Sequence, residues 1–447
     1  MTKGTVSRRD FVKVSALGGG AMVLAACAAP AAPAPAANAA VAKEKVSLSM
    51  WTHDNLYVQF FNARAKEWEV KYPQYEFTYD FQQVPEVFTK MLSSLSANEV
   101  VPDLFGLEQG QFPNFMKGDI LGQKFVDLTD LVTTEKDKFV ENNWSKFTAN
   151  GKIYGVDSSL CACVFYYQPK VLEKAGLTEF PKTWEDFMAA GEKAASQGVF
   201  LSAIDSEDSG IFSLLFLQRG GAFFANDNSF VLSKAENKAM AVEVLKYLQD
   251  GIKNKVFWPA TSADFWGAGL MAAHKEGKVM GVPGADWWSD FVLKPNAKDQ
   301  EGNWQITLMP KWKAGGHVSS TWGGTGFGIT QASKHKDLAW DLLHFTYMTK
   351  ENQIKRYEEI KYFPHMIEAI NDPRVTGVKD AYYGDQMVGS VLADSAKDMP
   401  LMFQSEVRVD LTTELNKQCT NVYAGKQTPE EAIDAVIAAT EKAISDL

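Results

Sequence analysis

The sequence predicts an α/β fold built on doubly wound sheets. The prediction rests on the order of the elements expected within residues 46–106. Apolar residues alternate with polar ones at 46–51 and most clearly at 75–81, the pattern of strands with one buried face. Apolar residues recur at helical spacing in 58–68 and 87–95. A short buried strand follows at 102–106. Strand, helix, strand, helix, strand indicates a sheet whose ligands bind beyond the carboxyl ends of its strands.

The composition points to a ligand with both apolar and hydroxyl-bearing faces. Twelve tryptophans and 12% aromatic content exceed what a core of this size requires. A sugar ring packs its C–H face on an aromatic plate, and its hydroxyl groups need planar carboxylate or amide partners. Such groups lie side by side in the candidate ligand-binding set: Trp51, His53, Asp54, Asn55, Glu108, Gln109, Trp266, Asp286, Trp287, Trp288, Trp322 and Gly323.

Each candidate also has a structural interpretation. Trp51 ends a core strand, and residues 53–55 could simply cap the helix that follows. Trp322 could brace the turn at Gly323. Of Trp287 and Trp288, one is expected to face the ligand, because neighbours in sequence point in different directions.

Charge and motifs narrow the function classes. The formal charge is −10, which argues against nucleic acid and against electrostatic binding to anionic lipid. The chain has no P-loop, HExxH motif or nucleophile elbow, and its six histidines are scattered. We therefore expect no catalytic residue, no metal and no cofactor. A glycosidase with two catalytic carboxylates remains an alternative, because the distance between two carboxylates cannot be read from a sequence.

The N-terminus carries export signals. Residues 7–13, SRRDFVK, resemble the twin-arginine consensus, and a short apolar segment follows. Residues 24–27, LAAC, resemble a bacterial lipobox, which implies a signal peptide at 1–26 and lipid on Cys27. The alternative is ordinary secretory cleavage with Cys27 incidental. Ala- and Pro-rich residues make 27–45 a semi-rigid tether.

The run 151–187, GKIYGVDSSLCACVFYYQPKVLEKAGLTEFPKTWEDF, is the most informative stretch. It resembles the pattern GKxYGvP…YYNkxlfekaGl…PkTWeEf of extracellular solute-binding protein family 1, the sugar-type receptors of ABC importers. Asp157 stands where Pro is usual and Gln168 where Asn is usual. Residues 277–288 and 323–329 also resemble segments of that family.

This resemblance implies a periplasmic-binding-protein-like fold of type II, with two doubly wound lobes joined by a multi-strand hinge. We place the N-terminal lobe at 46–157 and 309–347, and the C-terminal lobe at 158–308 and 348–447. The three crossings are expected near 157–160, 307–310 and 346–349. Residues 161 and 163, both cysteines, are expected to be buried free thiols on one side of an extended segment.

The resemblance further implies a monomeric, extracytoplasmic, lipid-anchored receptor that binds a carbohydrate and delivers it to ABC permease subunits. One rival keeps the fold and changes the solute to a polyamine or glycerol phosphate, since Asp54, Glu108 and Asp286 leave room for a cation. The other rival is an extracellular glycosidase or lyase, which uses similar aromatic subsites.

Overall fold

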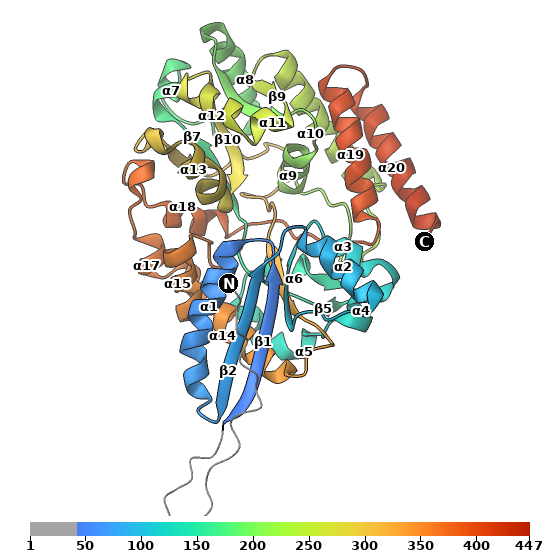
Figure 1. The fold of residues 1–447 in the computed structure, drawn as a ribbon. Coiled ribbons are helices and arrows are strands. Elements are labelled where there is room, and N and C mark those ends of the chain that lie inside the picture. Colours follow the sequence, from blue (N-terminus) through green and yellow to red (C-terminus); the bar gives the residue numbers. More distant parts are fainter. Residues whose placement is uncertain (1–42) are drawn as a thin grey trace, which may run out of the picture. The chain divides into compact units, whose positions relative to one another are not determined.

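A computed structural model describes residues 43–447, and Glu44–Leu447 form one compact unit (Figure 1). The signal peptide predicted at 1–26, the lipidated Cys27 and nearly all of the tether lie outside the described residues. Among residues 43–447, no helix is both long enough and apolar enough to cross a membrane.

Two five-stranded sheets organise the described chain (Figure 1). In spatial order, the first sheet consists of β2 (Tyr75–Gln83), β1 (Glu44–Thr52), β3 (Leu104–Glu108), β12 (Thr325–Ile329) and β6 (Val156–Asp157). The second consists of β11 (Gln305–Thr307), β7 (Cys163–Tyr167), β10 (Val279–Ala285), β8 (Phe200–Asp205) and β9 (Phe257–Ala260). A separate hairpin pairs β4 (Thr148–Ala149) with β5 (Lys152–Ile153).

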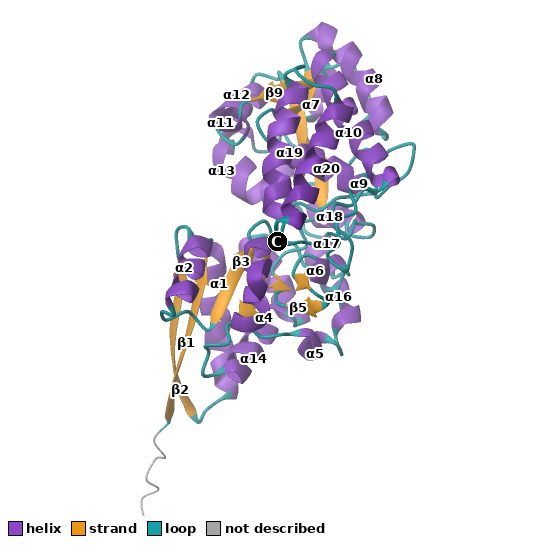
Figure 2. Cartoon of the chain, turned by 90° about the vertical axis from the view of Figure 1, so that its right-hand side faces the viewer, coloured by secondary structure: helices purple, strands orange, loops and turns teal. Residues whose placement is uncertain are grey.

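Each sheet has two parallel and two antiparallel strand pairings, and the antiparallel ones involve strands that lie next to the passages between the sheets. β1 runs parallel to β2 and β3, and β8 runs parallel to β9 and β10. β12 is antiparallel to β3, and β7 is antiparallel to β10. Helices cover the sheets, as Figure 2 shows. The predicted α/β class with two doubly wound parts is confirmed.

The helices divide into three groups along the chain. Up to β7 they are α1 (Asn55–Trp68), α2 (Val87–Ala97), α3 (Phe112–Met116), α4 (Ile120–Lys124), α5 (Thr129–Val132) and α6 (Asn142–Ser145). From β7 to β11 they are α7 (Pro169–Lys174), α8 (Trp184–Ala194), α9 (Gly210–Gln218), α10 (Ala235–Lys253), α11 (Ser262–Phe265), α12 (Ala268–Lys275) and α13 (Lys294–Asn296). After β12 they are α14 (Lys336–Tyr347), α15 (Lys350–Ile360), α16 (Ile367–Ile370), α17 (Pro373–Thr376), α18 (Val388–Ser395), α19 (Arg408–Tyr423) and α20 (Pro429–Ser445).

Helix α1 shows how local sequence sets these elements. The Asp54 carboxylate caps it by accepting a hydrogen bond from the Leu56 backbone N–H at 2.9 Å. Its Phe61, Ala65 and Trp68 side chains are fully buried, as the helical spacing predicts. Burying one such large apolar side chain stabilises the fold by about 1.5–3 kcal/mol. Thr428 and Glu431, three residues apart, are the sequence pattern of a capping box, and the structure has this capping box at the start of α20.

The chain passes between the sheets where its extended structure is broken. The extended segment expected to carry both Cys161 and Cys163 is divided into β6 and β7, and Cys161 between these strands has a φ of 58°. The prediction of one extended run is therefore wrong at 158–162. Cys161 and Cys163 are buried free thiols, as predicted, and Cys419 is a third buried free thiol of the described chain. The return passage lies between β11 and β12.

The predicted third crossing at 346–349 is wrong. These residues join α14 to α15, and both helices pack against α1 beside the first sheet. Arg64 of α1 forms an ion pair with Glu359 of α15 at 3.1 Å, and Lys355 pairs with Glu67 at 2.9 Å. α18, later in the chain, packs against β7 and β11 of the second sheet. The exact lobe boundaries stay a prediction.

Candidate functional site

Two pockets lie where the carboxyl ends of strands from both sheets meet, as expected for open α/β sheets. One, here called the aromatic pocket, has a volume of about 370 Å³ and is lined by His53, Asp54, Tyr57, Gln83, Ser159, Cys161, Trp266, Trp287, Phe291, Gly324 and Tyr362. The other, the polar pocket, has a volume of about 340 Å³. Its wall is formed by Gln109, Gly110, Gln111, Asp208, Ser209, Gly210, Ser213, Leu214, Leu217, Thr321, Trp322, Gly323, Met402, Gln404, Arg408, Val409, Thr412, Thr413 and Asn416.

A cluster of four tryptophans separates the two pockets. The Trp322 ring centroid lies 5.5 Å from that of Trp287 and 5.6 Å from that of Trp266. Trp322 lines the polar pocket, whereas Trp266 and Trp287 line the aromatic one. The Trp287 indole N–H donates a hydrogen bond to the Trp322 carbonyl at 2.7 Å, which fixes the indole against this wall. Trp288 is the fourth member, stacked near Trp322 at 6.3 Å.

The adjacent glycines allow this close approach. Gly323 and Gly324 have φ angles of 82° and 119°, which other residues rarely adopt. A Cβ atom on Gly323 would lie 3.2 Å from the Trp287 indole nitrogen, and one on Gly324 would lie 2.8 Å from the Lys146 ammonium. The turn therefore brings backbone, rather than side chains, to the boundary between the pockets.

Trp287 and Trp288 have different roles, which their adjacency in sequence suggested. Trp287 is half-buried and lines the aromatic pocket. Trp288 is fully buried and packs against Phe265, with ring centroids 5.6 Å apart. Trp288 therefore belongs to the core and supports the wall from behind.

The polar side of the aromatic pocket comes from the turn after β1. His53 and Asp54 both line it, and the Asp54 side chain also caps α1. The Tyr362 hydroxyl donates a hydrogen bond to the second Asp54 oxygen. Asn55 begins α1, is exposed and lines neither pocket.

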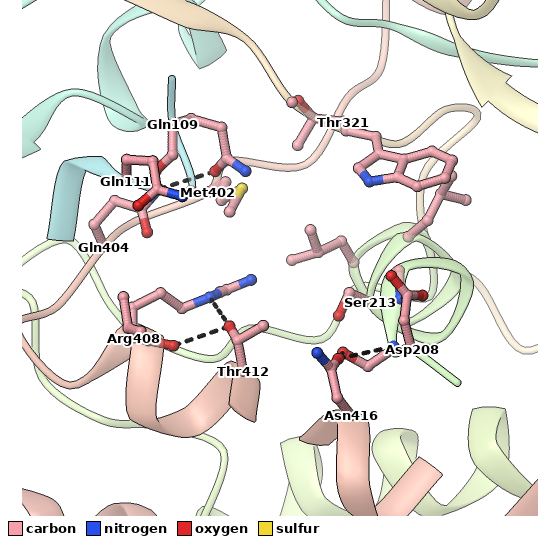
Figure 3. A pocket seen from close by; sticks show the side chains of 18 of the residues that line it. Gln109, Gln111, Asp208, Ser213, Thr321, Met402, Gln404, Arg408, Thr412 and Asn416 are labelled. Carbon is pink, nitrogen blue, oxygen red and sulfur yellow. Dashed lines mark hydrogen bonds between the residues drawn. The ribbon is translucent and has the colours of Figure 1, made fainter. Parts of the chain in front are cut away.

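Amide side chains dominate one side of the polar pocket (Figure 3). The Gln404 amide N–H group donates to the Gln109 side-chain oxygen at 3.0 Å, across 295 positions of sequence. The Gln109 backbone N–H donates to the Gly324 carbonyl at 2.8 Å. Gln404 is fully buried, and its own side-chain oxygen has no hydrogen-bond partner among the described residues.

The other side of the polar pocket carries a carboxylate. Asp208, in the loop after β8, accepts a hydrogen bond from the Gly210 N–H at 2.7 Å. Desolvation in this wall raises the pKa of Asp208 to about 6. Asn416 of α19 lies beside it (Figure 3) and accepts a 2.6 Å hydrogen bond from the Ser209 hydroxyl group.

Glu108 acts on the pocket through the backbone. It ends β3 and accepts a hydrogen bond from the Gly110 N–H at 2.8 Å, so it shapes the 109–111 loop. Burial of its carboxyl group raises the pKa to about 7. Glu108 itself does not line the polar pocket.

Two further predicted site residues lie away from both pockets. Asp286 is 3% exposed, and its Oδ2 atom accepts hydrogen bonds from the Ser159 hydroxyl at 2.7 Å and the Phe363 N–H at 2.9 Å. These bonds tie the end of β10 to the segment between β6 and β7, because a buried carboxylate needs such partners. Trp51 lies under the Lys90 ammonium group, 3.9 Å from it, on the α2 side of β1.

Several lining residues were missed from the sequence. In the aromatic pocket they include Gln83, Phe291 and Tyr362; in the polar pocket they include Asp208, Met402, Gln404, Arg408 and Asn416. The polar run that follows β8 was a usable signal for Asp208, since loops at such strand ends hold ligands. Residues 402–416 carried no signal, because the polar face of α19 has the pattern of an ordinary solvated helix face.

Comparison with known proteins agrees with this architecture. Over 399 residues the chain is 27% identical to the arabinooligosaccharide-binding protein of Bacillus subtilis (strain 168), covering 87% of this chain and 90% of that protein. A crystal structure of an extracellular solute-binding protein of family 1 superposes with a TM-score of 0.74, at 18% identity, over 89% of this chain and 99% of that one.

A second solved structure is the ABC transporter associated binding protein from B. animalis subsp. lactis Bl-04 in complex with β-1,6-galactobiose. It superposes with a TM-score of 0.68 at 20% identity, over 90% of this chain and 97% of that one. Residues 63–380, well over half of the chain, match the family described as bacterial extracellular solute-binding protein. The chain belongs to this family of bacterial extracellular solute-binding proteins.

Proposed function

We propose that this protein captures an oligosaccharide in the paired aromatic and polar pockets and delivers it to the permease of an ABC importer. The observation that carries the proposal is the tryptophan wall, with indole rings of Trp266 and Trp287 on one side and the Gln109–Gln404 amides beyond Trp322. Indole faces suit the C–H face of a sugar, and amides suit its hydroxyl groups. Two adjoining pockets suit a ligand of more than one sugar unit.

Of the residues expected from the sequence, we assign His53, Asp54, Gln109, Trp266, Trp287, Trp322 and Gly323 to ligand contact, since all line a pocket. Glu108, Asp286 and Trp288 are assigned to supporting this site. The related protein that binds arabinooligosaccharide supports a sugar as the solute class. A carboxylate near aromatic rings also suits a polyamine, so amines and glycerol phosphate belong in any ligand screen.

We expect the parts of the chain that carry the two sheets to close around the ligand, because residues from both sheets line each pocket. Each pocket takes residues from both sheets, for example His53 after β1 and Trp287 after β10. A ligand that bridges them gains contacts available only in a closed state, which shifts the equilibrium toward closure. Moving the closed fraction from 1% to 99% requires about 5.5 kcal/mol of differential binding.

Isothermal titration with a panel of arabino-, galacto-, gluco- and xylo-oligosaccharides, spermidine and glycerol phosphate tests the solute class. We expect binding of at least one oligosaccharide and chromatographic recovery of that sugar unchanged, which also tests the absence of catalysis. Small-angle scattering with that sugar should show compaction. Binding of only the amine or the phosphate would contradict the proposal, and release of shortened sugars would favour a glycosidase or lyase.

We further propose that the protein is a monomer exported through the twin-arginine route and anchored outside the cytoplasm by lipid on Cys27. Family membership supports the extracytoplasmic location. The lipobox-like LAAC sequence supports the anchor. Detergent phase partitioning of the full chain and of Cys27→Ser tests it: the unchanged chain should enter the detergent phase and the variant should not.

A further inference from the structure

Arg408 is a cation in the wall of the polar pocket without a carboxylate partner. Among residues 43–447 no Asp or Glu lies within ion-pair distance of its guanidinium group, although most other buried cations of the fold have such a partner. The structure records one side-chain hydrogen bond from it, from Nε to the Thr412 hydroxyl at 3.3 Å. Within the described chain its buried Nη1 has no hydrogen-bond partner.

The surroundings hold this guanidinium group in place instead of neutralising it. It lies over the Phe223 ring, 4.6 Å from the centroid, and its stem is fixed at the first residue of α19. Burial lowers the pKa of Arg408 to about 10, so it remains charged at neutral pH. Arg408 is partly exposed in the pocket wall, so a carboxylate of a ligand can reach its charge and form a charge-assisted hydrogen bond with it.

The first turn of α19 adds to the positive character of this corner. The helix has 16 residues, and the residue before it, Val407, has no side chain that caps it. Arg408, Val409 and Thr412 of its first turns line the pocket. Free N–H groups and the helix dipole at such an end favour an anion.

The opposite corner has the reverse character. Asp208 and Asn416 lie across the pocket from Arg408 (Figure 3). Among the described residues that line the polar pocket, Arg408 and Asp208 are the only charged ones, and they lie apart from each other. A ligand with negative charge along its whole length would be repelled at the Asp208 end, whereas a ligand with one acidic end and one hydroxyl-rich end would fit both.

We propose that the solute is an oligosaccharide with a single uronic acid unit, whose carboxylate pairs with Arg408. This inference rests on the proposed sugar-binding function and narrows its substrate class. A carboxylate forms a charge-assisted hydrogen bond with a guanidinium group, which is stronger than the bond that a hydroxyl group can form with it. The remaining hydroxyl groups of the ligand meet Asp208 and Asn416, which line the same pocket.

Matched ligands test the charge directly. Titrations compare xylo-, arabino- and galacto-oligosaccharides that end in one glucuronate or galacturonate with the same compounds after reduction of the carboxyl group to hydroxymethyl. For at least one backbone we expect the acid to bind about 10- to 100-fold more tightly than its reduced form, since hydrogen bonds to charged groups are the stronger ones. The preference should shrink as NaCl is raised, because salt screens the pair.

Substitutions of Arg408 test whether this residue causes the preference for the acidic sugar. Arg408→Gln should bring the ratio of affinities for the acid and its reduced form close to one, whatever its effect on affinity overall, and Arg408→Lys should restore part of the preference. Lys417→Gln removes one positive charge from the exposed face of the same helix, outside the pocket, and should preserve the preference. Circular dichroism melting of each variant verifies that it is folded.

The outcomes separate this inference from the proposed function. Equal or tighter binding of all the reduced sugars, or a preference that survives in Arg408→Gln, overturns the uronate proposal while sugar binding stands. Failure of every sugar, acidic and neutral, overturns both.

Discussion

The two pockets of this protein are built in different ways, although one tryptophan wall serves both. The aromatic pocket takes many of its walls from short local patterns at strand ends, such as residues 53–54 after β1 and Trp287 after β10. The polar pocket joins segments as distant as Gln109 and Gln404. The difference teaches that short sequence patterns at strand ends can form an aromatic surface. The polar and charged side chains of the polar pocket come together only because the fold brings distant chain segments side by side.

The largest effects are expected from replacing Trp287, which lines the aromatic pocket, and Trp288, which is buried behind it. Trp288→Ala should lower the free energy of unfolding by about 3–5 kcal/mol, because it removes a fully buried ring from the core. Trp287→Ala should weaken ligand affinity by at least about 30-fold, as expected for an aromatic anchor, with a much smaller loss of stability. Urea denaturation and titration measure the two quantities, and equal destabilisation by both variants would contradict the division.

A smaller effect is expected from the amide pair of the polar pocket. Gln404→Ala removes the hydrogen bond to Gln109 and the free acceptor oxygen, so affinity for the ligand should fall about 3- to 10-fold. Gln123→Ala changes an exposed glutamine of α4 and serves as the control, measured in the same titration. If the two variants bind equally well, the polar pocket does not contact the ligand.

The Glu108 carboxyl group makes a pH-dependent contribution on the polar side. Burial raises its pKa in the folded state to about 7, above its ordinary value of 4.5, so folding favours the protonated form. Ionisation therefore lowers stability as pH rises between about 4.5 and 7, and the full loss is present above pH 7. We expect Glu108→Gln to melt at a higher temperature than the unchanged protein at pH 8.5, with the difference disappearing at pH 4. A difference independent of pH would contradict this.

The smallest effect on binding is expected at Trp51. Its indole contacts the Lys90 ammonium group and lines neither pocket, so Trp51→Ala should change ligand affinity by less than about twofold. Titration beside Trp287→Ala measures the contrast between two tryptophans that the sequence treated alike. A large loss of affinity in Trp51→Ala would extend the aromatic pocket toward β1.

Local interactions explain which predictions succeeded. The strands β1 to β3, helices α1 and α2, and the capping box of α20 follow from periodicity and capping groups within a few residues of one another. Similar signals brought Asp54 and Trp287 into the predicted site. The same reasoning failed at 158–162, where Cys161 adopts a positive φ that no β-branched or aromatic pattern indicates.

By itself the sequence determined the α/β class, the strand ends whose loops line the two pockets, and the abundance of indole rings near carboxylates and amides. Only the tertiary structure decided that Trp287 faces a pocket while Trp288 fills the core, and that Asp286 braces the passage between the sheets. It also placed Arg408 opposite Asp208. The physical reason is that burial and charge pairing depend on neighbours hundreds of positions away, which no local pattern of residues records.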